Sequence, residues 1–166
     1  MDLTAIKELL QAEGFEAAFQ TATTEAPVDQ LFVLLNLSDD ASLALEMLYV
    51  PGLDEELEGT RLLQYFVRLP FEVDGTEDQL SRLLAQVNAI APLVGFGMKE
   101  QERMVYFRHV AVMPRDAGVT EAVVIKETVW LINYLVDTYL GVIGSVASGR
   151  QTAADELARE IGPARI

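Results

Sequence analysis

Residue types that commonly carry out acid–base or metal chemistry are sparse in this chain. Its 166 residues include one histidine and no cysteine, which excludes disulfides and thiolate metal sites within the chain. A metal site built on His109 would need carboxylates for all its other ligands. The neighbours of His109 at every second position, Val105, Phe107 and Ala111, are apolar and predict an apolar strand face. A structural role for His109 is therefore favoured over a catalytic one.

Two short motifs lack the context that a ligand site would need. Gly95-Phe96-Gly97 falls in a predicted hairpin strand with no helix after it, so a bend or bulge is expected rather than a phosphate site. The acidic run Asp54-Glu55-Glu56-Leu57-Glu58 lacks calcium-loop spacing and is expected to be solvated. No pair of carboxylates has a spacing that marks a general acid and base. We therefore expect no catalytic residue, no cofactor, no metal and no enzymatic activity.

The predicted strands carry a weaker chemical signal, because both of their faces are rather apolar. One face must pack on helices, and the other mixes apolar groups with a few polar ones. These polar residues are Asn36, Glu46, Gln64, Arg68, Tyr106 and Arg108. If they align, they form a semi-apolar, partly covered surface with an ion pair, in which Glu46, Arg68, Tyr106 and Arg108 could bind a small anion. The alternative is a cross-strand salt bridge on an ordinary exposed face.

The element that organises the chain is the apolar run from Thr120 to Ser148, which predicts a helix capped by Thr120 and stopped by Gly149. Its apolar stripe covers about half of the circumference, so the helix should lie against a sheet. The stripe consists of Val124, Ile125, Thr128, Ile132, Leu135, Val136, Tyr139, Val142, Ile143 and Val146. Charged residues, among them Lys126 and Asp137, interrupt the run, so no membrane span is expected.

The opposite side of this helix carries Val123, Trp130, Tyr134 and Gly141. Either another part of the same chain, such as the first helix, covers these residues, or they form a contact with a protein partner or a second copy. Aromatic anchors beside small residues are typical of such contacts. The two alternatives are equally favoured.

The remaining elements predict an α+β fold with an antiparallel sheet, an N-terminal helix, a middle helix and the long C-terminal helix. We expect a helix from Asp2 to Gly14, strands at 15–19, 31–37, 43–50 and 62–73, a helix from the capping box at 76–79 to Pro92, and a hairpin of 93–99 with 103–113. A turn is expected at 38–41. Residues 1–150 would form a single domain, and 151–166 a tail.

The net charge of −14 is unevenly distributed. Residues 1–60 hold thirteen acidic side chains and one lysine, a net charge of −12. A phosphate backbone would be repelled, so nucleic-acid binding is not expected. The first residues do not match a secretory signal, and a soluble cytoplasmic protein without membrane association is expected.

The stretch 88–96 (Asn-Ala-Ile-Ala-Pro-Leu-Val-Gly-Phe), followed by Val105-Tyr106-Phe107-Arg108 and the closing apolar helix, resembles the YbjN-like family. That family is similar in fold to the class I type III secretion chaperones. The resemblance implies an α+β domain that is often dimeric and binds other proteins. Our leading hypothesis is a homodimeric, non-enzymatic interaction module, chaperone-like or regulatory, that binds a protein partner through apolar surface. The alternative is a sensor of small anions.

Overall fold

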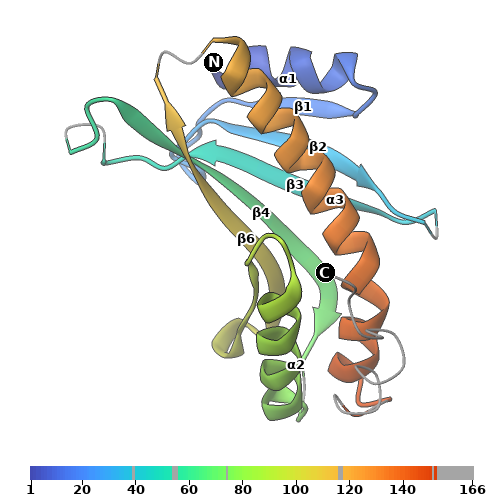
Figure 1. Cartoon of the computed structure of the whole chain (residues 1–166). Coiled ribbons are helices and arrows are strands. Elements are labelled where there is room, and N and C mark those ends of the chain that lie inside the picture. Colours follow the sequence, from blue (N-terminus) through green and yellow to red (C-terminus); the bar gives the residue numbers. More distant parts are fainter. Residues whose placement is uncertain (39, 54–55, 74, 116–117, 151, 153–166) are drawn as a thin grey trace. The chain divides into compact units, whose positions relative to one another are not determined.

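The predicted fold class is confirmed by the computed structural model, which describes residues 1–38, 40–53, 56–73, 75–115, 118–150 and 152. A six-stranded antiparallel sheet has the order β1-β2-β3-β4-β6-β5 and is accompanied by three helices (Figure 1). The helices are α1 (Leu3–Ala12), α2 (Glu77–Ile90) and α3 (Val119–Ala147), and η1 (Glu100–Glu102) is a short 3-10 turn. The strands are β1 (Ala17–Gln20), β2 (Gln30–Asn36), β3 (Ser42–Tyr49), β4 (Thr60–Glu72), β5 (Phe96–Lys99) and β6 (Met104–Pro114).

Several sequence predictions fall on residues outside the described part of the chain. They are Asp39 in the predicted turn at 38–41, Asp54 and Glu55 in the acidic run, and the tail at 151–166 except Thr152.

The chain divides into two compact units, which are described separately. The first comprises Met1–Val67 and Arg108–Asn133, and the second comprises Arg68–Phe107 and the chain from Tyr134 onward. β4, β6 and α3 each contribute residues to both units.

In the first unit, α1 begins where the sequence predicted. The Asp2 side chain accepts a hydrogen bond of 2.8 Å from the Ala5 amide, and Gly14 adopts a φ of 92° just beyond the helix. A side-chain oxygen at the N-cap satisfies one of the amides that a helix leaves unpaired at its start. Ile6 and Leu10 are fully buried, and α1 contacts β1 and β2, beside which it lies in Figure 1.

The strands of the first unit bury one face and leave the other partly exposed. Alternate residues of β2, β3 and β4 are almost completely buried and form the core: Leu31, Val33, Leu35, Leu45, Met47, Leu63, Tyr65 and Val67. Successive side chains of a strand point to opposite faces, so the residues between them form the outer face. The outer face of these strands is only half-buried at Phe32, Glu46 and Phe66. The predicted division into a packed face and a mixed face is therefore confirmed.

The buried side of α3 differs slightly from the predicted stripe. Ile125, Val129 and Ile132 are fully buried, whereas Val124, which was assigned to the stripe, is 41% exposed. The prediction was wrong for Val124. The buried face of α3 runs through residues three and four positions apart, starting at Ile125, and Val124 lies at the edge of that face. α3 also begins one residue before Thr120, so Thr120 lies inside the helix and does not cap it.

The C-terminal end of α3 lies in the second unit and confirms the prediction for Gly149. Gly149 has a φ of 68°, and its amide donates to the Val146 carbonyl over 3.0 Å. Glycine adopts this left-handed conformation without the penalty that a Cβ would bring. As a whole, α3 is long and apolar enough to cross a membrane, but core helices of globular proteins meet the same criterion, so this is weak evidence for a span.

The second unit also contains α2, whose cap differs from the predicted capping box. The Thr76 hydroxyl donates to the Ala147 carbonyl over 3.0 Å and makes no capping bond to α2. The capping box was wrong because Thr76 has a ψ of 11° and not the extended backbone of an N-cap residue. Its hydroxyl is instead held by a carbonyl in the last turn of α3, a contact that no local sequence pattern encodes. The buried side of α2 consists of Leu80, Leu83, Leu84 and Val87.

The link from α2 to β5 is fixed by the Asn88 side chain. Its carbonyl accepts from the amides of Gly95 and Phe96 over 3.1 and 3.0 Å, and its amide donates to the Phe96 carbonyl over 2.7 Å. The bend or bulge expected at 95–97 does not fall within β5, since Gly97 pairs in regular register with Tyr106. A Cβ at Gly97 would lie 2.6 Å from the Tyr106 ring, so this glycine provides room for an aromatic side chain.

Candidate functional site

Three surfaces could carry a function, and the first is the exposed side of α3. In the first unit, Val123 and Trp130 are 49% and 46% exposed. Tyr134 and Gly141 belong to the second unit, where Tyr134 is 61% exposed and Gly141 is also exposed. The Phe15 ring, just after α1, packs against Trp130 with 4.7 Å between ring centroids and 56° between planes. Part of the Trp130 ring is thus covered by its own chain, as one of the two alternatives expected, and nearly half remains accessible.

The part of this surface that belongs to the first unit carries little net charge. Besides Val123 and Trp130, it includes the exposed Val119. Lys126 pairs with Glu13 over 3.5 Å and with Glu127 over 3.9 Å. We call Val119, Val123 and Trp130 the α3 strip. Exposed apolar clusters of this kind often mark contacts with other molecules.

The second surface is the outer face of the sheet in the first unit. Phe32 of β2 and Phe66 of β4 lie directly opposite Glu46 of β3, one on each side. Glu46 accepts a hydrogen bond of 2.9 Å from the Gln30 amide. The sequence pointed to Glu46 but not to its alignment with the two phenylalanines, which depends on the register of three strands.

The four predicted anion-binding residues are divided between the two units. Glu46 and Arg108 belong to the first unit, and Arg68 and Tyr106 belong to the second. Arg108 Nε donates to Gln64 over 2.8 Å and Glu46 accepts from Gln30, so each of these two charged side chains bonds to a neutral amide. The anion-sensor alternative stays a prediction.

A hollow of about 280 Å³ lies beside Phe32 on the outer face of the sheet. It is lined by Glu16, Ala17, Ala18, Phe32, Val33, Leu34 and Ala44. In the register, Ala18 lies opposite Phe32, and Ala44 lies opposite Leu34. The hollow arises because small alanines lie next to large apolar side chains on the same face.

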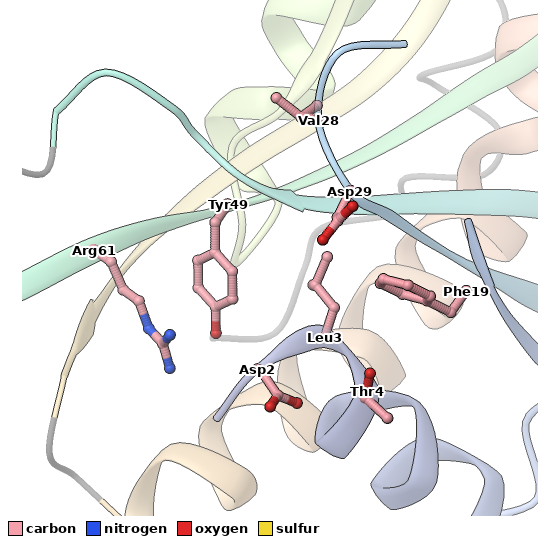
Figure 2. A pocket seen from close by; sticks show the side chains of 8 residues that line it. All are labelled: Asp2, Leu3, Thr4, Phe19, Val28, Asp29, Tyr49 and Arg61. Carbon is pink, nitrogen blue, oxygen red and sulfur yellow. The ribbon is translucent and has the colours of Figure 1, made fainter. Parts of the chain in front are cut away.

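The third surface is a cavity of about 460 Å³ near the start of α1. Figure 2 shows the residues around it: Asp2, Leu3 and Thr4 from the beginning of the chain, Phe19 from β1, Val28 and Asp29 from the segment before β2, Tyr49 from β3 and Arg61 from β4. Asp2 caps α1, and Asp29 accepts a hydrogen bond of 2.8 Å from the Ala22 amide. These two carboxylates therefore already have structural partners.

Arg61, at the edge of this cavity, belongs to a buried ionic cluster. Glu121 is only 2% exposed and is the buried charged residue of the described chain. It pairs with Arg61 Nη2 over 2.8 Å and with the amino group of Met1. The Arg61 guanidinium lies 4.2 Å above the centre of the Tyr49 ring, whose hydroxyl donates to the Met1 carbonyl over 2.7 Å.

The protonation states in this cluster suit a structural role. Burial would raise the pKa of Glu121, but hydrogen bonds from the Met1 amino group and Arg61 hold it below its usual value. Burial raises the pKa of Tyr49 to about 12, although the Arg61 charge opposes the rise. A carboxylate that stays ionised and is bound by two cations is a poor proton acceptor. The cluster therefore fixes the start of the chain to β4 and α3.

The predicted structural position of His109 agrees with its surroundings. His109 is partly buried on the same strand face as the buried Val105, Phe107 and Met113. Its ring centroid lies 6.1 Å from that of the buried Tyr65. Among the described residues, no group of three or more histidine, cysteine, aspartate or glutamate side chains could hold a metal ion.

No family model, curated protein or solved structure matches this chain. The resemblance to the YbjN-like family and the secretion chaperones therefore stays a prediction.

Proposed function

We propose that the protein is a non-enzymatic interaction module, chaperone-like or regulatory, that forms a homodimer through the α3 strip. The observation that carries this proposal is Trp130, which Phe15 supports on one side and which remains 46% exposed. A tryptophan held in place by its own chain loses little side-chain freedom on binding, which favours a role as an interface anchor. A cytoplasmic location, and partners other than nucleic acid or membranes, belong to the same proposal.

The charge distribution makes a contact between two copies feasible. A protein of net charge −14 resists self-association unless its interface is nearly neutral. Next to the α3 strip, Lys126 pairs with both Glu127 and Glu13. Two copies could therefore approach through the strip without bringing large like charges together.

The mass of the assembly tests this proposal. Trp130→Glu would bury an unpaired charge in the interface and should convert a dimer into a monomer with the same circular dichroism. Val123→Asp should do the same without removing the contact between Phe15 and Trp130. Gln101→Glu adds one negative charge at an exposed position of η1 and should leave the dimer intact. Light scattering coupled to size exclusion reports the mass. A monomeric wild type, or a dimer that survives both α3 substitutions, would contradict the proposal.

A further inference from the structure

The outer sheet face of the first unit places a carboxylate between two aromatic rings. Phe32, Glu46 and Phe66 are aligned across β2, β3 and β4, and all three side chains are half-buried. Directly opposite residues of antiparallel strands share a face, with their Cβ atoms about 5 Å apart. Glu46 is therefore flanked by phenylalanine on both sides. We call these three residues the Glu46 row.

This combination of groups matches a guanidinium group. A carboxylate binds the planar guanidinium through two parallel hydrogen bonds, and aromatic rings attract the same cation at their faces. Gln30 occupies one Glu46 oxygen with a bond of 2.9 Å. A carboxylate has about four acceptor positions, so Glu46 keeps capacity for a cationic donor after that bond.

The hollow beside the Glu46 row suits the rest of an arginine side chain. Phe32 belongs to both, and the outer-face side chains of Ala18, Leu34 and Ala44 line the hollow beside it. The apolar stem of arginine packs readily on such a surface while its charged head stays at a polar rim. Glu16 supplies a second carboxylate at the hollow.

We propose that the Glu46 row and its hollow bind an arginine side chain from an extended basic segment of another protein. Charge complementarity identifies this occupant, because residues 1–60, which include β2 and β3, carry a net charge of −12. Such a charge attracts basic segments over long range and discriminates against acidic ones. The inference goes beyond the proposed dimer, since it concerns other residues and a different partner.

Fluorescence polarisation with a defined peptide tests this inference. The probe is a fluorescein-labelled eight-residue peptide in which arginine alternates with valine. We expect saturable binding that Glu46→Gln weakens about tenfold or more, the usual effect of losing a charged hydrogen bond. Phe32→Leu should also weaken binding, and so should lysine in place of arginine in the probe. A probe with glutamine in place of arginine should not bind.

A charge-matched variant separates this site from general attraction to an acidic protein. Glu8→Gln removes one exposed carboxylate from α1 and should leave the affinity within about twofold. Equal weakening by Glu8→Gln and Glu46→Gln, or no binding of the arginine probe, would overturn the inference. Amide NMR spectra of the wild type provide a readout that does not depend on folding of the variants. The probe should shift resonances of the Glu46 row, and shifts confined to other strands would also overturn it.

The outcome is independent of the proposed dimer. Val123→Asp should leave binding of the arginine probe unchanged, because Val123 is not part of the sheet. A monomeric wild type that binds the probe would refute the α3 dimer alone. A dimer that does not bind the probe would refute the arginine site alone.

Discussion

Glu121→Gln should destabilise the protein more than any other exchange of a carboxylate for an amide among the described residues. The substitution keeps the shape of the side chain but removes the charge that compensates Arg61 and the Met1 amino group. Arg61 Nε is already buried without a hydrogen-bond partner. The guanidinium therefore depends on its Nη2 contacts for compensation.

The size of the effect follows from burial. Removing one partner of a fully buried ion pair costs about 3–5 kcal/mol. Glu121 is 2% exposed but Arg61 is 20% exposed, so water can partly solvate the charge that remains. We expect a loss of about 2–4 kcal/mol in the free energy of unfolding at pH 7. The double variant Arg61→Met/Glu121→Leu removes both charges and should lose less than the sum of its two single variants.

Urea unfolding followed by circular dichroism measures these differences, with Glu127→Gln as the control. Glu127 is in the same helix but is 67% exposed, so its substitution should change stability by no more than about 0.5 kcal/mol. A Glu121→Gln variant that lies within the same range as this control would refute the assignment of a buried ionic cluster.

The pH dependence of stability tests the direction of the Glu121 pKa shift independently. The folded-state pKa of Glu121 lies below its usual value of 4.5. Its contribution to stability is therefore complete above pH 4.5 and disappears as the pH falls through the folded-state pKa. The difference between the wild type and Glu121→Gln should shrink across that window. A difference that stays constant from neutral to strongly acidic pH would contradict the proposed ion pairs.

Three further predictions concern other parts of the chain. Gly141→Ala should raise the thermal midpoint of unfolding, since nothing lies within 4 Å of the added Cβ. Gly144→Ala should lower the thermal midpoint, since its Cβ would lie 2.6 Å from the Phe71 ring. His109→Gln should cost about 1 kcal/mol in unfolding experiments and leave dimer mass and peptide binding unchanged, and a selective loss of binding would contradict a structural role. Duplex DNA should show no salt-sensitive affinity in polarisation assays at low and physiological salt.

Local patterns were sufficient to predict most of the fold. The spacing of Leu80, Leu83 and Val87 predicts the buried side of α2, and alternation in β2 separates Leu31 and Val33 from Phe32. Such patterns work because each element buries one side of a regular repeat. The cap at Asp2 and the stop at Gly149 are equally local, since both depend on backbone groups within one turn.

The candidate sites were less predictable because they join residues that are distant in sequence. Arg61 and Glu121 are separated by 60 positions, and the only local signal was a carboxylate at the start of an apolar helix. The Glu46 row requires the registers of two strand pairs at once. A shift of one residue in either pair would move a phenylalanine to the opposite face. The sequence could therefore indicate a mixed face but not which side chains meet on it.

The two proposed contacts imply a final prediction about avidity. In the first unit, the buried side of α3 and the Glu46 row belong to opposite faces of the sheet, because Leu45 and Met47, which neighbour Glu46 in sequence, are buried in the core. A dimer formed through the exposed side of α3 would leave both arginine sites open. It should therefore bind a peptide with two arginine–valine segments, joined by a long flexible linker, more tightly than a peptide with one. Val123→Asp should remove this gain and leave affinity for the single segment unchanged. An equal gain for wild type and variant would mean that the two sites are not linked through α3.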